Sequence, residues 1–174
     1  MKNIISPMFR GSFANLVEPR AINEESKAKY SIAIPIKKDD KEGEAFLKAI
    51  EDRAVTMAQE QWGKVPATFN RGSQKAGIRD GDLSEVESFQ GCWTVGASSL
   101  YQPNCVDRSL QPIIDPNELY SGAWYKVAVS VYIWNHPTGG KGYSVGLQNV
   151  QKVKDDEKFG GGSAAADDFD PIDD

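Results

Sequence analysis

The sequence predicts a mainly β protein with one long helix, followed by an acidic tail. Apolar residues recur with helical spacing between residues 44 and 62, whereas several other stretches alternate apolar and polar residues as β-strands do. From residue 160 onward the chain consists mostly of glycine, alanine and aspartate, which cannot build a core. The 174 residues suit one compact domain. We therefore expect a domain over residues 1–154 and a flexible linker with a disordered acidic tail over residues 155–174.

Two strands are expected before the helix. Residues 29–36 place large apolar side chains on one side, and Pro35 indicates that this strand ends there or runs along a sheet edge. Residues 8–17 form a weaker candidate, in which Phe9 and Phe13 share a face.

The helix is expected over residues 44–62. Asp39 and Asp40 are available as N-caps, and Gly63 followed by Pro66 ends the helical pattern. The apolar side of this helix consists of Leu47, Ile50, Ala54, Met57 and Ala58.

Residues 63–90 show no sustained period, and so long an irregular segment is usually functional or mobile. The charges up to residue 79 are all basic, and those after it are all acidic. Phe69 lies among the cations, an arrangement typical of grooves that bind single-stranded nucleic acid. One interpretation is a flexible basic arm that contacts nucleic acid; the other is an ordinary solvated loop. The cations of this arm are Lys64, Arg71, Lys75 and Arg79.

Three further strands are expected over residues 92–99, 123–135 and 143–153. The last two form a hairpin around Gly139 and Gly140. The alternation slips near residue 148, which indicates a bulge.

The strand over residues 123–135 has two faces of different character. Its odd-numbered residues are apolar and form the expected core face. Its even-numbered residues include three large aromatics and a lysine, which suits a platform on which bases stack while the lysine contacts phosphate. A sheet buried on both faces and a dimer interface are the other two interpretations. The predicted platform consists of Trp124, Lys126, Tyr132 and Trp134.

The formal net charge of -5 is unevenly distributed. Residues 155–174 contain eight acids and one lysine, a net charge of -7, whereas the preceding residues carry +2. A linker would hold the acidic segment near a basic groove at an effective concentration in the millimolar range. We expect the tail to compete with DNA for that groove and, once displaced, to bind other proteins. The predicted partner-binding residues are Asp167, Asp168, Phe169, Asp170, Ile172, Asp173 and Asp174.

Several functional classes lack support in the sequence. No apolar run is long enough to span a membrane, and the first residues lack a signal-peptide core, so we expect a cytoplasmic protein. There is no P-loop motif for nucleotide hydrolysis. The single histidine, His136, lies in an expected turn, and the two cysteines are expected to be reduced. Asp80 and Asp82 could serve a metal-dependent nuclease, but they come from one segment without a histidine. We expect no catalytic residue, no metal and no cofactor.

Six short segments occur in order and together span residues 12–152, nearly the whole body. They are Ser12–Pro19, Lys29–Pro35, Arg79–Asp82, Val106–Arg108, Tyr120–Gly122 and Gly146–Lys152. With these segments and the acidic tail, the chain resembles the OB-fold single-stranded-DNA-binding proteins of bacteriophages.

The resemblance implies a five-stranded Greek-key β-barrel that coats single-stranded DNA without strong sequence preference. It also implies a tail that recruits replication or recombination proteins, in the cytoplasm of an infected bacterium. The usual OB order places the helix after the third strand, whereas only two strands precede residue 44 here, unless residues 3–15 are bent into two. Self-association is left open, and the alternative function is a phage structural or adaptor protein whose aromatic strand face is a subunit interface. The predicted DNA contacts are completed by Lys29, Arg108 and Lys152.

Overall fold

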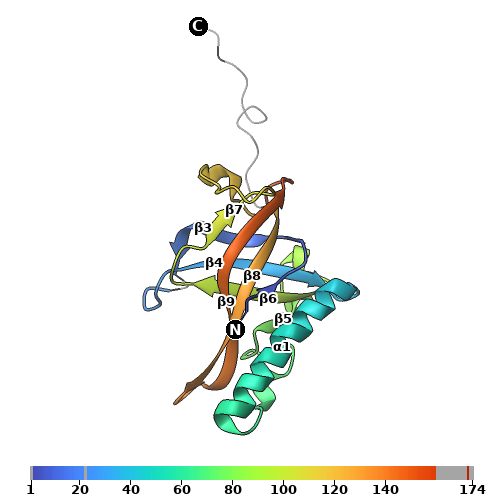
Figure 1. The fold of residues 1–174 in the computed structure, drawn as a ribbon, viewed down its shortest axis with the longest axis vertical. Coiled ribbons are helices and arrows are strands. Elements are labelled where there is room, and N and C mark those ends of the chain that lie inside the picture. The colour runs from blue at the N-terminus through green and yellow to red at the C-terminus, as the bar shows by residue number, and fades with distance from the viewer. Residues whose placement is uncertain (1, 22, 160–171, 173–174) are drawn as a thin grey trace.

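Within the described residues, 2–21, 23–159 and 172 of a computed structural model, nine strands form one sheet and one long helix packs against it (Figure 1). The predicted class, mainly β with one helix, is confirmed. In chain order the elements are β1 (Ile4–Ile5), β2 (Phe9–Arg10), β3 (Ser12–Arg20), β4 (Lys29–Lys37), α1 (Lys41–Trp62), η1 (Ala67–Phe69), β5 (Ile78–Asp80), η2 (Gly81–Leu83), η3 (Glu87–Phe89), β6 (Cys92–Ser99), β7 (Asn104–Val106), η4 (Pro116–Glu118), β8 (Trp124–His136) and β9 (Gly140–Lys154), where η marks a short 3-10 helix.

The sheet closes into a barrel because the N-terminal strand bends. Its first two pieces, β1 and β2, pair with β8, and its third piece, β3, pairs with β4. From β4 the barrel continues through antiparallel β6, parallel β9 and antiparallel β8. The result is the five-stranded Greek-key barrel of the OB fold, as the resemblance implied.

Helix α1 has the caps that the sequence predicted. The Asp40 side chain accepts a hydrogen bond from the Glu42 backbone N–H at 3.0 Å, and Gly63 ends the helix with φ of 73°. The buried side of α1 packs on β1, β4 and β8. No helix among the described residues is long and apolar enough to cross a membrane.

The position of α1 in the chain departs from the usual OB order, as the sequence indicated. The N-terminal strand is indeed bent, but its pieces together form one barrel strand. Helix α1 therefore connects the second barrel strand, β4, with the third, β6.

The β8–β9 hairpin is the longest feature of the sheet and reaches from the upper end of the barrel in Figure 1 to beyond the barrel at its lower end. Its odd-numbered residues from Ala123 to Val131 are buried, as predicted. The residues of β9 on either side of Gln148 pair with adjacent residues of β8, so Gln148 has no partner opposite it. This confirms the predicted bulge.

Residues 63–90 are not a free arm. Phe69 and Ile78 are buried in the core, and β5 pairs with the first half of β6. The second half of the same edge of β6 pairs with β9, so this segment fills a gap in the barrel wall. The absence of a period in the sequence reflects three short 3-10 helices rather than mobility.

Candidate nucleic-acid interface

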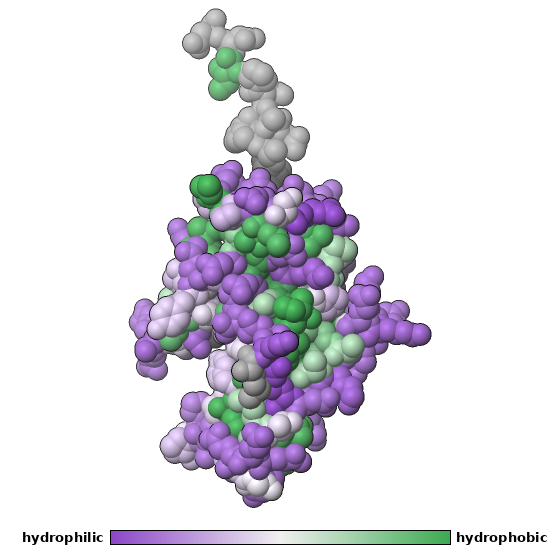
Figure 2. Space-filling model, in the orientation of Figure 1, coloured by the Kyte–Doolittle hydropathy of each residue, from purple (hydrophilic) through white to green (hydrophobic). Residues whose placement is uncertain are grey.

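A cleft of about 580 Å³ lies between the tip half of the β8–β9 hairpin, residues 72–84 and the outer face of β4 and β6. We call it the hairpin cleft. In Figure 2 the outline of the molecule is indented between the barrel and a lower lobe, which in Figure 1 holds the hairpin tip and the C-terminal end of α1. Residues that line the cleft include Ala33, Lys75, Arg79, Phe89, Thr94, Gly96, Trp134 and Ser144.

The floor of the hairpin cleft is made of small side chains. Ala33 of β4 lies opposite Gly96 of β6, and a Cβ atom added at Gly96 would meet no atom within 4 Å. Strand alternation explains this arrangement, because the neighbours Val95 and Ala97 point into the core. A flat ligand can therefore lie close to the backbone of β6.

Trp134 provides an aromatic wall. Its indole N–H donates to Ser144 Oγ at 3.0 Å, and its ring lies against Gly142, where any side chain would collide with it. The His136 ring packs against the indole with centroids 4.7 Å apart. The half-buried indole is thus held in one orientation, which lowers the entropy cost of stacking a base on it.

Lys75 and Arg79 supply positive charge to the same cleft. The Lys75 carbonyl accepts a hydrogen bond from the Tyr143 N–H at 3.1 Å, and the Lys75 ammonium lies beside Gly140 at the hairpin turn. Arg79 is exposed on β5, where it pairs with Thr94 of β6. Within the described part of the chain, neither cation forms a salt bridge, so both are available to phosphate.

Four other predicted cations are exposed. Lys64 borders a shallow pocket at the hairpin tip, and Lys29 pairs with Arg20 at the far end of β3 and β4. Lys126 lies on the outer face of β8, and Arg108 lies in the loop after β7. None of the four lines the hairpin cleft.

Phe69 and Arg71 have structural roles instead of the predicted contacts with DNA. Phe69 is 5% exposed and packs edge-on against Tyr143, with ring centroids 5.1 Å apart. The Arg71 guanidinium binds the carboxylates of Glu44 and Glu51 on α1. Its hydrogen bonds lower the pKa of the Glu44 carboxyl and its own pKa is raised, as expected for a committed ion pair. We therefore leave both residues out of the DNA surface.

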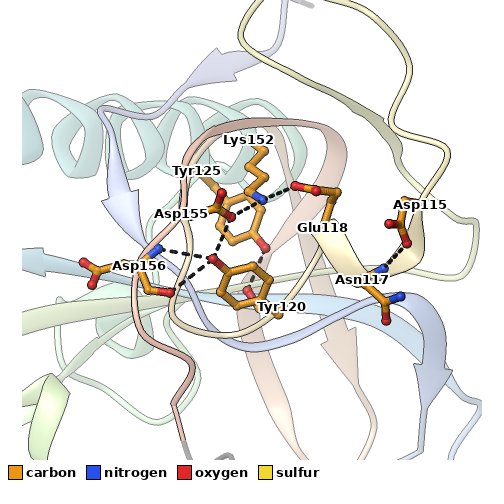
Figure 3. A network of polar contacts seen from close by, with 8 residues as sticks. All are labelled: Asp115, Asn117, Glu118, Tyr120, Tyr125, Lys152, Asp155 and Asp156. Carbon is orange, nitrogen blue, oxygen red and sulfur yellow. Dashed lines mark hydrogen bonds and ion pairs between the residues drawn. The ribbon is translucent and has the colours of Figure 1, made fainter.

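Lys152 is likewise committed within the protein, at the end of β9 (Figure 3). Its side chain is 7% exposed and donates to Glu118 at 2.6 Å and to Asp155 at 2.5 Å. The Tyr120 hydroxyl donates to the same Asp155 carboxylate at 2.7 Å. The Lys152 and Tyr120 hydrogen bonds lower the pKa of Asp155. Lys152 thus fastens the chain after β9 and is removed from the predicted DNA contacts.

Residues 155–159, which we call the tail root, pack on this end of the barrel. Trp124 donates its indole N–H to Asp156 at 2.9 Å, and this bond is the main cause of a lowered Asp156 pKa. Arg10 donates to the Glu157 carbonyl at 2.7 Å and lies 4.1 Å from the centroid of the Phe159 ring. The packed body therefore extends past the expected boundary at residue 154.

The acidic end of the chain falls largely outside the described residues. Ile172 is described and is exposed. The predicted partner-binding residues outside the described part are Asp167, Asp168, Phe169, Asp170, Asp173 and Asp174.

The predicted platform on β8 is divided between two places. Trp134 lines the hairpin cleft, whereas Trp124 is bonded to the tail root. Tyr132, which pairs with Ser144 of β9, is 41% exposed between them. The subunit-interface alternative supposes one continuous aromatic face, whereas Trp134 and Trp124 lie at two separate places on β8.

Asp80 and Asp82 form a closed ion-pair cluster. Both accept hydrogen bonds from Lys38 at 2.7 Å, and this bond is the first cause of the lowered pKa of each carboxyl. Among the described residues no group of three potential metal ligands occurs. The lysine occupies the place that a cation would take, so the nuclease alternative has no support here.

A second cleft, of about 570 Å³, lies beside the tail root, and we call it the root cleft. Its most exposed ring is Phe13. The sequence predicted that Phe13 shares a face with Phe9, but Phe9 is buried and Phe13 is exposed, so that expectation is wrong. A register shift between Ser12 and Asn15 turns Phe13 outward, and its ring packs against Phe89 with centroids 6.0 Å apart. Alternation alone could not reveal this, because a bulge reverses the faces of a strand.

The chain matches a known family over its whole length. The model of the family described as "Enterobacter phage Enc34, ssDNA-binding protein" matches residues 1–174. A protein p50 of Acyrthosiphon pisum secondary endosymbiont phage 1 is 27% identical over 172 residues, covering 94% of this chain and 90% of that protein.

Two solved structures share the fold. The single-stranded-DNA-binding protein from bacteriophage Enc34, in complex with ssDNA, superposes with a TM-score of 0.75 at 24% identity, covering 90% of this chain and 88% of that one. The single-stranded-DNA-binding protein gp2.5 of bacteriophage T7 gives a TM-score of 0.62 at 13% identity, covering 92% and 96%.

Proposed function

The chain belongs to the family of the Enterobacter phage Enc34 ssDNA-binding protein, and from this premise we propose that it is a phage protein that coats single-stranded DNA without strong sequence preference. The observation that carries the proposal is the hairpin cleft. It joins in one place a fixed indole, a floor of small side chains and two cations that form no salt bridge with any residue that the structure describes.

The binding mechanism divides between bases and phosphates. Trp134 stacks on a base, an interaction worth about 1–3 kcal/mol for any base because every base has a π-face. Lys75 and Arg79, across the cleft, contact the phosphates on either side and release counterions. Neither interaction reads base edges, which accounts for weak sequence preference.

The same geometry favours single strands over duplex. The indole lies inside a cleft rather than on a convex surface, so a base must leave its own stack to reach it. In duplex DNA that step costs a few kcal/mol for each unpaired base.

The acidic tail has a regulatory role in this proposal. The tail root leaves the barrel beside the root cleft, since Phe159 lines it. From there residues 167–174 can compete with DNA for the cations and, once displaced, bind replication or recombination proteins. Deleting residues 167–174 should tighten binding to ssDNA; unchanged affinity would argue against competition.

The protein acts by binding, in the cytoplasm of the infected host, and the proposal assigns it no catalytic step and no cofactor. It is tested by fluorescence anisotropy with labelled oligothymidylate and with a duplex of equal length, over a range of salt concentrations. We expect micromolar or tighter binding of the single strand at low salt and weaker binding of the duplex. No binding of the single strand at low salt would overturn the proposal.

A further inference from the structure

We propose that the root cleft is a second nucleobase-binding site, with Phe13 as its stacking ring and Arg20 and Lys29 as its phosphate contacts. The inference rests on the proposed function and deepens it, because it extends the DNA path from the hairpin cleft to the ends of β3 and β4. Of these three residues, only Lys29 was predicted from the sequence to contact DNA.

Phe13 occupies a backbone conformation that its side chain makes costly. Its φ is 49°, in the left-handed region that residues other than glycine rarely adopt. The bulge explains why the backbone bends there, but glycine would make the same bend with less strain. The ring is nevertheless 53% exposed. A strained residue that displays an apolar ring to solvent indicates selection for that ring rather than for the fold.

The wall beside Phe13 offers polar groups suited to a nucleotide. Ser12 lines the root cleft, and its buried hydroxyl has no hydrogen-bond partner among the residues that the structure describes. Arg20 also lines the cleft, and it pairs with Lys29 of the neighbouring strand. Arg20 and Glu87 are the two charged residues among those that line the cleft, and Lys29 adds a second cation beside Arg20 at this edge.

The two clefts are neighbours along one path. Phe89 lines the hairpin cleft, and its ring packs against Phe13, which lines the root cleft. Ala33 in the floor of the hairpin cleft pairs with Ser12 in the root cleft. A strand stacked on Trp134 can therefore continue over the pair of phenylalanines to Arg20 without leaving the protein surface.

The far wall of the root cleft belongs to the tail root. Phe159 lines the cleft, is held by Arg10, and its N–H donates to the Ser121 carbonyl at 3.0 Å. A base that enters this site thus touches the segment from which the acidic tail departs.

The test compares two substitutions that relieve the same backbone strain. Phe13→Gly removes the ring, and Leu110→Gly is its matched control, because Leu110 is the other described non-glycine residue with positive φ, at 66°, and it lines neither cleft. Phe13→Gly also removes the packing of its ring on Phe89, so thermal unfolding and circular dichroism are used to show that both variants are folded at the temperature of the binding measurement. Trp134→Ala serves as the reference for the hairpin cleft.

Binding is measured with oligothymidylates of about 5 and about 15 nucleotides, lengths within the range of site sizes of one OB fold. In the parent, affinity should rise with length as the second site is reached. Phe13→Gly should weaken binding of the longer oligonucleotide by about 5- to 150-fold, the loss of one stacked base, and so flatten the dependence on length. Leu110→Gly should change neither affinity.

Three results would overturn the inference while leaving the proposed function intact. Phe13→Gly could bind the longer oligonucleotide as the parent does, or lose affinity for both lengths equally. It could also bind more tightly, which would show that the chain's own tail occupies the root cleft. Failure of the parent to bind either oligonucleotide would instead overturn the proposed function itself.

Discussion

Trp124 donates its indole N–H to the Asp156 carboxylate at 2.9 Å, and this bond ties the start of β8 to the tail root. Ten residues further along the same strand, Trp134 donates to Ser144 and faces the hairpin cleft. Of these two tryptophans on one face of β8, Trp124 thus holds the tail root and Trp134 faces the hairpin cleft.

Trp134→Ala should lower the affinity for oligothymidylate by about 5- to 150-fold, because it removes one stacked base worth about 1–3 kcal/mol. Trp124→Ala should lower the free energy of unfolding by about 1–2 kcal/mol and leave the affinity within about twofold. Anisotropy titrations and urea denaturation of both variants measure these effects. A loss of affinity in Trp124→Ala with unchanged affinity in Trp134→Ala would show that Trp124 is the stacking residue.

Gly96→Val should block the hairpin cleft without harming the fold. The added side chain enters open space over the floor, and valine suits a strand better than glycine does. The free energy of unfolding should stay equal or rise by about 0.5–1 kcal/mol, while affinity for ssDNA falls by about tenfold or more. Asn149→Val, exposed on the outer face of β9, is the matched control and should change neither quantity.

Salt dependence separates the cations that contact phosphate from those that hold the fold. Replacing Lys75 or Arg79 by alanine should reduce the slope of log K against log salt by about 0.7, the value for one phosphate of a single strand. Arg71→Ala should leave the slope unchanged and lower the free energy of unfolding by about 1–3 kcal/mol, because its bonds to Glu44 and Glu51 are lost. A changed slope for Arg71→Ala would contradict the assignment.

The contacts between the tail root and the barrel should contribute less to the free energy of unfolding at acid pH. The pKa values of Asp155 and Asp156 are lowered in the folded protein by bonds from Lys152 and Trp124. Their stabilising effect is therefore complete above the unfolded pKa of about 4 and is lost as pH falls through the lower folded values. Denaturation between about pH 5 and pH 2 should show less acid sensitivity in an Asp155→Asn, Asp156→Asn double variant than in the parent. Equal sensitivity would mean that these contacts contribute nothing to stability.

Much of the fold was predictable because its signals are local. Helix α1 is indicated by the spacing of its apolar residues and by the caps Asp40 and Gly63. The β8–β9 hairpin is indicated by the alternation of apolar and polar residues and by the glycines of its turn. Closure of the barrel was not predictable from patterns, because it depends on one N-terminal strand pairing with both β8 and β4. Only the family resemblance supplied that topology.

The sequence indicated which types of residue form the candidate site, but not which individual residues of those types line it. Trp134, Lys75 and Arg79 do meet in one cleft. Arg71 and Lys152 look equally suitable in the sequence, yet Arg71 pairs with Glu51, 20 residues away, and Lys152 pairs with distant Glu118 as well as with nearby Asp155. Pairing across such distances is decided by tertiary structure, so charge patterns cannot reveal which cations remain free.

The central claim is that single-stranded DNA lies in the hairpin cleft. The most direct measurement is photochemical cross-linking of an oligothymidylate that carries 5-iodouracil, followed by mass spectrometry of the cross-linked peptides. We predict cross-links in the peptides that contain Trp134 and Phe89, which both line this cleft. Cross-links confined to the peptide around Trp124 and Lys126, with none at Trp134 or Phe89, would contradict the claim.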